Sequence, residues 1–329
     1  MVVASSVPSV VSSSGSRAGS TSTIHRPVVS IGNLALGGRG KTPLAALVAR
    51  LLVDAGERPA ILSRGYRRRL PEEGVVVVSD GTRILSDLDR SGDEPLLLAR
   101  TVAGAAVLVC DVRAMAAAVA ETTLGSTVHI LDDGFQHTSL ARDVDIVVVT
   151  PADLDGRRLP FGSLRSSPKS LANVDAVIVD GHASEQVLAK IECVISARTR
   201  VFAMGRTLGT PELLETERAW PTGRWPVVAL CAIARPERFR EALREAGWHV
   251  AQTISMRDHH PFTRRDVEKV AAAVREHGAE MVLTTAKDAM RLLPLRPFPV
   301  PIASVPLTVT VAPVDEFRAW LIGRVRGGA

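Results

Sequence analysis

A glycine-rich segment followed by lysine and threonine stands near the start of the chain. It reads Gly37-Gly38-Arg39-Gly40-Lys41-Thr42, and it lies between the apolar run 28–31 and a helical pattern that begins at Pro43. Such backbone at a helix N-terminus binds phosphates, while the lysine reaches the β- and γ-phosphates and the threonine can ligate Mg²⁺. The segment predicts an ATP and Mg²⁺ site; the alternative is an ordinary glycine-rich turn. The usual phosphate-loop pattern has glycine where this chain has Ala35, so the segment is a Gly-Gly-x-Gly-Lys-Thr variant.

A pair of carboxylates follows a second apolar run. Asp132 and Asp133 come directly after residues 127–131, at the predicted carboxyl end of a strand. Ligands of open α/β sheets bind at that edge, and carboxylates there can hold Mg²⁺ beside a phosphate loop. We expect Asp132 to ligate the metal together with Thr42, and Asp133 to hold a water or a second contact to the metal. The alternative is that the pair only forms the turn before Gly134.

Composition limits the classes of protein that remain. The chain has 329 residues, 46% of them hydrophobic and 23% charged, and a formal net charge of +5. These values are typical of a folded protein of about two domains. Three widely spaced cysteines match no zinc pattern or disulfide framework, and no apolar run reaches the roughly 18 residues that span a bilayer. With 4% aromatic residues and so small a net charge, no nucleic-acid partner is expected.

The elements that must position these residues alternate along the chain. Short apolar runs, predicted to be buried strands, alternate with Ala/Leu/Arg-rich segments, as in βαβ units. The predicted strands are 28–31, 60–62, 105–109, 128–131, 146–149 and 176–179, and after a Gly- and Pro-rich stretch 227–232, 282–285 and 302–305. The predicted helices are 43–54, 236–246 and 264–277. The pattern predicts an α/β fold: a P-loop NTPase-like parallel-sheet domain flanked by helices, joined by a short connector to a second, smaller α/β domain.

The expected domain boundaries follow from this pattern. Residues 1–25 are expected to form a loose Ser-rich tail, 26–195 a P-loop NTPase-like domain, 196–225 a connector, and 226–329 a second α/β domain that closes the cleft.

Further motifs make the prediction more specific. They are Gly32-Asn33 with the phosphate loop, Ser63-Arg64-Gly65-Tyr66, Gly92-Asp93-Glu94-Pro95, Asp132-Asp133-Gly134-Phe135-Gln136-His137, Asp258-His259-His260-Pro261-Phe262 and Thr284-Thr285-Ala286-Lys287-Asp288. In this order, from about Pro27 to Leu292, the chain resembles the tetraacyldisaccharide 4'-kinase family. The resemblance implies a kinase that transfers the γ-phosphate of ATP to the 4'-hydroxyl of a tetraacyl glucosamine disaccharide 1-phosphate, in lipid A biosynthesis.

The resemblance also implies roles for particular residues. Asp93 matches the catalytic base, His259 the histidine that pairs with it, and Lys41 the phosphate-loop lysine. Arg64, Arg113 and Arg165 match basic positions that contact the anionic substrate. Without the resemblance, Asp93 could simply cap a helix, His259 could be an exposed loop residue, and each arginine could belong to a solvated face.

The resemblance sets the remaining expectations. The expected partner is the lipid disaccharide, and the expected location is the cytoplasmic face of the bacterial inner membrane. The family's apolar N-terminal helix is replaced here by the Ser-rich tail, so we expect peripheral contact with an anionic membrane surface. A monomer is expected.

Other departures from the family pattern are local, and two other functions stay open. Leu164-Arg165-Ser166 stands where the family has Leu-Arg-Glu. Ala232 replaces the glycine of a family Gly-Ile pair, and Ala286 replaces a glutamate. The leading alternative is a switch-type P-loop NTPase that acts as a partitioning or metal-delivery regulator. A non-catalytic paralogue is a further alternative, against which the intact Lys41, Thr42, Asp132 and Asp93 argue.

Overall fold

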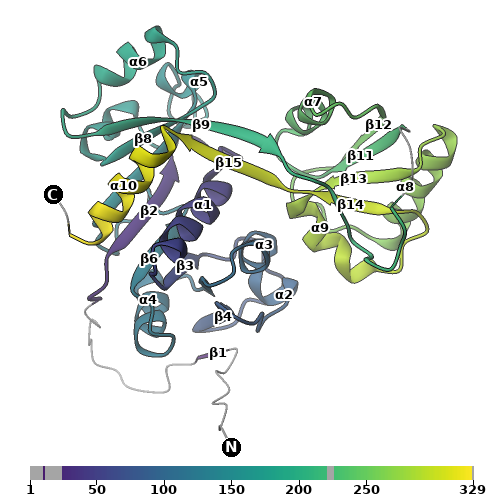
Figure 1. Cartoon of the computed structure of the whole chain (residues 1–329), viewed down its shortest axis with the longest axis horizontal. Helices are drawn as coiled ribbons and strands as arrows, with labels where there is room; N and C mark the ends of the chain where they lie inside the picture. Colours follow the sequence, from purple (N-terminus) through teal and green to yellow (C-terminus); the bar gives the residue numbers. More distant parts are fainter. Residues whose placement is uncertain (1–9, 12–23, 221–225, 328–329) are drawn as a thin grey trace, which may run out of the picture. The chain divides into compact units, whose positions relative to one another are not determined.

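A computed structural model describes residues 10–11, 24–220 and 226–327 of the chain (Figure 1). The expected tail 1–25 and part of the expected connector lie mostly outside these ranges. The chain divides into two compact units, one of residues 1–205 and 309–329 and the other of residues 206–308. The division differs from the expected one, because the C-terminal residues return to the first unit instead of completing the second.

The first unit contains a ten-stranded, mostly parallel sheet. Its strand order is β1-β4-β5-β3-β6-β2-β7-β8-β9-β15. The strands are β1 (Val10–Val11), β2 (Val28–Asn33), β3 (Pro59–Ser63), β4 (Val75–Asp80), β5 (Ala106–Val109), β6 (Val128–Asp132), β7 (Val144–Val149), β8 (Ala176–Asp180), β9 (Arg200–Leu208) and β15 (Leu307–Ala312). All the pairings from β5 through β9 are parallel, whereas β4 runs antiparallel to β5 and β1 to β4. The predicted α/β class with a parallel sheet is confirmed.

Helices connect the strands of this unit. They are α1 (Lys41–Asp54), α2 (Leu88–Ser91), α3 (Asp93–Thr101), α4 (Arg113–Thr122), α5 (Pro151–Leu154), the 3-10 helix η1 (Pro168–Asn173), α6 (Glu185–Glu192) and α10 (Val314–Val325). Helix α1 packs on β2, β3 and β6, and α4 packs on β3 and β5. The strands are buried along almost their whole length, as expected for a sheet covered by helices.

Helix α10 explains why the C-terminal residues belong to the first unit. The ring of its Phe317 lies 5.1 Å from that of Phe202 in β9, edge to face, and both side chains are buried. Its Arg324 donates to Asp175 at 2.6 Å. Burial of the aromatic pair holds the helix on the sheet.

The second unit has a five-stranded sheet of its own. Its strand order is β10-β14-β13-β11-β12, with β10 antiparallel and the other pairs parallel. The elements are β10 (Glu212–Leu213), β11 (Val227–Cys231), α7 (Pro236–Glu245), β12 (Val250–Ser255), α8 (Arg264–Glu276), β13 (Met281–Thr285), α9 (Ala286–Leu292), the 3-10 helix η2 (Leu293–Leu295) and β14 (Ile302–Val305). Helix α8 buries one apolar face on β11 and β13, as its spacing predicts. The chain enters this unit within β9 and leaves it within β15.

Candidate active site

The glycine-rich segment forms a loop between β2 and α1, as predicted. Gly40 adopts a left-handed conformation with φ of 82°, which a residue with a side chain adopts at a cost, and α1 starts at the next residue. No acidic side chain lies in the first turn of α1. The positive end of the helix dipole is therefore unopposed by its own first turn, which favours an anion at this position.

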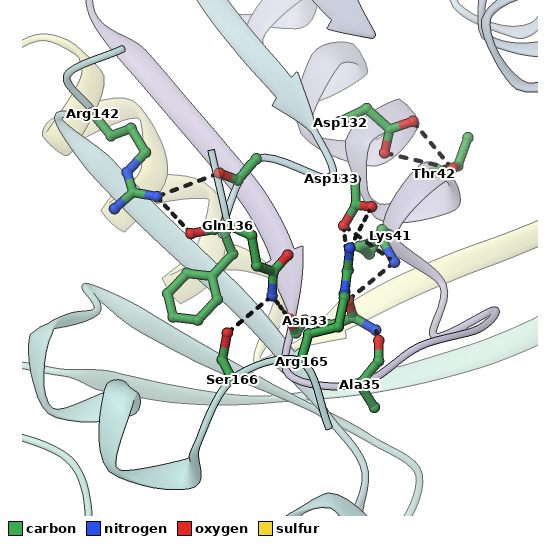
Figure 2. A network of polar contacts seen from close by, with 12 residues as sticks. Asn33, Ala35, Lys41, Thr42, Asp132, Asp133, Gln136, Arg142, Arg165 and Ser166 are labelled. Atoms are coloured by element: carbon green, nitrogen blue, oxygen red, sulfur yellow. Dashed lines mark hydrogen bonds and ion pairs between the residues drawn. The ribbon is translucent and has the colours of Figure 1, made fainter. Parts of the chain in front are cut away.

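A compact group of charged side chains surrounds the start of this helix (Figure 2). Arg165 donates to both oxygens of Asp133, at 2.7 and 3.1 Å, and to Oδ1 of Asn33 at 2.7 Å. Lys41 donates to the same Asn33 oxygen at 3.1 Å, and its Nζ lies 3.4 Å from Oδ1 of Asp133. The side-chain amide of Asn33 donates in turn to the carbonyl of Ala35 at 2.7 Å, which fixes its orientation. The group holds two cations beside the phosphate loop, in the position where negative phosphates would be neutralised.

Asp133 is a charged member of this group. Its backbone is left-handed, with φ of 59°, in the turn that follows β6. Burial alone would raise the pKa of its carboxyl, but the hydrogen bond from Arg165 and the charge of Lys41 outweigh burial and lower the pKa. Asp133 is therefore ionised at neutral pH, and it orients both cations.

Asp132 differs from its neighbour, because it faces Thr42. The Thr42 hydroxyl donates to Asp132 at 3.2 Å. Burial and the charges of Glu94 and Asp133 raise the pKa of Asp132 to about 7. A buried carboxylate crowded by two others is a position where a divalent cation would relieve repulsion.

The residues present fit a magnesium ion bound together with a nucleotide. Among the described residues, no group of three or more His, Cys, Asp or Glu side chains could hold a metal alone. Mg²⁺ in nucleotide sites typically takes one or two protein ligands and completes its shell with phosphate oxygens and water. A hydroxyl and a carboxylate, from Thr42 and Asp132, would supply such a pair.

Arg39 belongs to the phosphate loop, but its side chain bonds to residues at α5. It is 4% exposed, and it donates to Asp153 at 2.6 Å and to the Thr150 hydroxyl at 3.1 Å. Asp153 also accepts from the backbone and hydroxyl of Thr150, so it caps α5 and binds the loop at once. Only the backbone of Arg39 is therefore placed to contact phosphate, while its side chain anchors the loop to α5.

Asp93 is the first residue of α3, and its side chain is buried. Its Oδ1 accepts from the Glu94 N–H at 2.9 Å, so it lies at the helix start as the alternative interpretation expects. Glu94 lies close enough to Asp132 for its charge to raise the pKa of that carboxyl. The helix that carries Asp93 therefore begins beside the carboxylate pair. Gly92 is the N-cap of this helix and Asp93 its first residue, a position that is compatible with a catalytic role.

Two of the predicted substrate arginines occupy different surroundings. Arg64 has a largely exposed side chain, 3.6 Å from Asp111. Arg113 is buried at the start of α4 and donates to the carbonyl of Cys110 at 2.6 Å. Burial lowers the pKa of Arg113, the charge of Asp132 opposes this effect, and that of Arg64 adds to it. Arg113 thus lies near Asp132, and Arg64 lies near Arg113. Contact of either arginine with substrate stays a prediction.

His259 lies in the second unit, in the segment between β12 and α8. Its Nε2 is 3.0 Å from Nζ of Lys287, and its backbone has a positive φ of 61°. The predicted pairing of His259 with Asp93 stays a prediction.

Two residues outside the predicted site residues connect the site. Asn33 joins Lys41 to Arg165, and its position at the end of β2 in the Gly32-Asn33 motif was the available signal. Gln136 donates to the backbone carbonyl of Asn33 at 2.8 Å and to the hydroxyl of Ser166 at 3.2 Å. Gly32 allows this arrangement, since a Cβ there would lie 2.3 Å from Cβ of Phe135.

Comparison with known proteins decides the family. The family profile described as tetraacyldisaccharide-1-P 4'-kinase matches residues 13–326. The chain belongs to this family. It is 40% identical over 278 residues to the tetraacyldisaccharide 4'-kinase of Geobacter metallireducens, covering 83% of this chain and 80% of that protein. It is 39% identical over 279 residues to that of an Anaeromyxobacter species, covering 82% and 74%.

A solved structure supports the same conclusion for the fold. LpxK from Aquifex aeolicus, crystallised in complex with ATP, superposes with a TM-score of 0.71 at 30% identity, covering 91% of this chain and 88% of that one. The predicted P-loop kinase fold is thereby confirmed, and the family suggested by the sequence motifs is correct. No helix within the described residues of this 4'-kinase family member has the length and apolarity needed to span a bilayer.

Proposed function

We propose that the chain transfers the γ-phosphate of ATP to the 4'-hydroxyl of a tetraacyl glucosamine disaccharide 1-phosphate, a step of lipid A biosynthesis. The proposal rests on the contacts beside the phosphate loop. Lys41 and Arg165 both contact the side chains of Asn33 and Asp133. The hydrogen-bonded pair of Thr42 and Asp132 lies next to them. Phosphoryl transfer depends mainly on positioning and on neutralising charge, and this group supplies both. Membership of the 4'-kinase family provides the acceptor.

Mg²⁺, which Thr42 and Asp132 would hold, would supply positive charge that neutralises the phosphates. The chain's own residues do the rest of the positioning. The backbone of residues 37–42 holds the phosphates, and Lys41 and Arg165 reach them from two sides. Asp133 keeps both cations in place, because each contacts its carboxylate.

Asp93 is proposed as the base that orients the acceptor hydroxyl and accepts its proton. Its burial at the start of α3, beside the carboxylate pair, supports this role. Arg64 and Arg113 are proposed to bind the anionic disaccharide, and His259 is proposed to take part in catalysis. We further propose that the protein acts as a monomer at the cytoplasmic face of the inner membrane, in peripheral contact with anionic lipid.

Replacement of the proposed base tests this role. Asp93→Asn is expected to lower turnover about 10²- to 10⁴-fold, because a positioned base contributes that much. ATP binding should be retained, since Asp93 is outside the phosphate loop. The control is Asp155→Asn, which changes an exposed carboxylate paired with Lys190. Full turnover by Asp93→Asn with normal ATP binding would remove Asp93 from this role.

The reaction class is tested by the dependence of ATP turnover on the acceptor. ATP hydrolysis is measured with and without detergent-dispersed tetraacyl disaccharide 1-phosphate. We expect consumption of ATP to require the disaccharide. ATP turnover that is independent of lipid and stimulated by a protein partner would contradict the kinase and favour the switch-type NTPase.

A further inference from the structure

Residues 157–164 form a tight loop between α5 and Arg165, closed by a bridge between Arg158 and Leu164 and named the 157–164 hairpin. The N–H of Leu164 donates to the carbonyl of Arg157 at 3.1 Å, and the N–H of Leu159 donates to the carbonyl of Leu164 at 2.9 Å. The N–H of Phe161 donates to the carbonyl of Arg158 at 3.0 Å across the tip. These bonds satisfy backbone groups within the hairpin, so it holds its shape without covering by other elements.

The base of the 157–164 hairpin is fixed to the phosphate-loop side of the sheet. Leu164 is fully buried in a core cluster and forms a bridge with Ala35. The N–H of Leu36, the residue before Gly37 of the phosphate loop, donates to the carbonyl of Ser163 at 2.9 Å. The tip is therefore carried on a rigid base beside the nucleotide loop.

The tip exposes large apolar side chains. Phe161 is 84% exposed, Leu159 is 50% exposed, and the neighbouring Leu36 is 51% exposed. No other large hydrophobic side chain among those described is as exposed as Phe161. Contact of these apolar side chains with water is unfavourable. They also add nothing to the stability of the hairpin, whose backbone groups are already hydrogen-bonded. Exposed apolar side chains gathered at one place indicate a surface that becomes covered in use.

The charges at the tip are of one sign. Arg157 and Arg158 are exposed, and neither forms an ion pair with a described residue. The nearby Asp155 is engaged by Lys190 at 2.6 Å. Apolar side chains flanked by unpaired arginines are complementary to the surface of an anionic bilayer, with acyl chains below a layer of phosphates.

We propose that the 157–164 hairpin docks on anionic lipid bilayers. Phe161 and Leu159 insert at the boundary between headgroups and acyl chains, with Leu36 beside them, and Arg157 and Arg158 bind lipid phosphates. Docking brings the edge of the phosphate loop to the surface that holds a lipid acceptor. In this respect the inference rests on the proposed function, for which it names the membrane-binding residues.

Sedimentation with vesicles tests the proposal. The vesicles are phosphatidylcholine alone or phosphatidylcholine with phosphatidylglycerol, at low salt. Phe161→Ser/Leu159→Ser is expected to weaken partitioning to the anionic vesicles at least about tenfold. Arg157→Gln/Arg158→Gln is expected to weaken it about fivefold per arginine, with no effect on neutral vesicles. The matched control is Val314→Ser/Arg198→Gln, an exposed apolar and basic pair elsewhere, which should bind as the wild type does.

Activity on detergent-dispersed acceptor separates this proposal from the proposed function. Phe161→Ser/Leu159→Ser should phosphorylate it at the wild-type rate and keep the wild-type melting temperature, since both side chains are exposed. Equal vesicle binding by wild type and both hairpin variants would overturn the docking proposal. So would a loss of activity on dispersed acceptor with unchanged vesicle binding, because the tip would then contact acyl chains of the acceptor. Failure of the wild type to phosphorylate dispersed acceptor would instead overturn the proposed function, whatever the vesicles show.

Discussion

The buried ion pair between Arg39 and Asp153 offers a quantitative test of how the phosphate loop is held. The two residues are 4% and 1% exposed, and Asp153 has two further hydrogen bonds, both from Thr150. Arg39→Met keeps much of the aliphatic volume but leaves Asp153 charged and buried. Breaking a buried pair in this way typically costs ~3–5 kcal/mol, and we expect about 3 kcal/mol because the bonds from Thr150 remain.

A second substitution should restore part of this loss. In Arg39→Met/Asp153→Asn no buried charge remains, while the amide oxygen of Asn can still accept from Thr150. We expect the double variant to recover about 1–2 kcal/mol relative to Arg39→Met. The free energy of unfolding is measured by urea denaturation, followed by circular dichroism. In a separate titration with an ATP analogue, Arg39→Met should bind about tenfold more weakly than the wild type. A stability of Arg39→Met within about 0.5 kcal/mol of wild type, or strictly additive effects of the two substitutions, would show that this ion pair does not hold the loop.

Two further predictions concern charge-assisted contacts. Arg165→Lys should lower kcat at least about tenfold, because an ammonium cannot make the two-pronged contact with Asp133 and also reach Asn33; an unchanged kcat in steady-state assays would contradict this. Asp80 accepts hydrogen bonds within the turn that follows β4. Burial would raise the pKa of its carboxyl, but hydrogen bonds from the Thr82 hydroxyl and from the backbone N–H groups of Arg83 and Thr82 lower this pKa from 3.8 to about 2. The carboxylate therefore stabilises the fold above pH 3.8, and this stability is lost as the pH falls toward 2. Asp80→Ala should lower the free energy of unfolding by about 1 kcal/mol at pH 6. In denaturation experiments below pH 4, the difference in this free energy between variant and wild type should shrink. A difference that stays constant with pH would exclude the titration of Asp80 as its source.

The sequence predicts the central strands and the phosphate loop well because their signals are local. Val28–Asn33, the glycine-rich loop and the helix after it follow one another without interruption, and each has its own pattern. Strand β9 was missed, within the expected connector, because its burial alternates and polar residues such as Arg206 and Thr207 interrupt the apolar run. The return of α10 to the first unit depends on contacts with Phe202 and Asp175, which no local pattern encodes.

In the site too, some residues could be predicted from local motifs and others depend on contacts between distant segments. Lys41, Thr42 and Asp132 could be placed from motifs, because they lie at or beyond the carboxyl ends of β2 and β6, at one edge of the sheet. The partners of Arg39 could not, because Asp153 is more than a hundred residues away and is an unremarkable acid beside a proline-started helix. The bridging role of Asn33 likewise needs the fold, which brings Arg165 to the end of β2.

Product analysis by mass spectrometry shows whether the chain phosphorylates the 4'-hydroxyl of the disaccharide. The protein is incubated with MgATP and tetraacyl disaccharide 1-phosphate, and Lys41→Ala, which removes the phosphate-loop ammonium, is the control. We expect the wild type to produce a lipid that is heavier by one phosphate group, located on the 4' position by fragmentation, and Lys41→Ala to produce almost none. ATP hydrolysis by the wild type without any phosphorylated lipid would contradict this expectation.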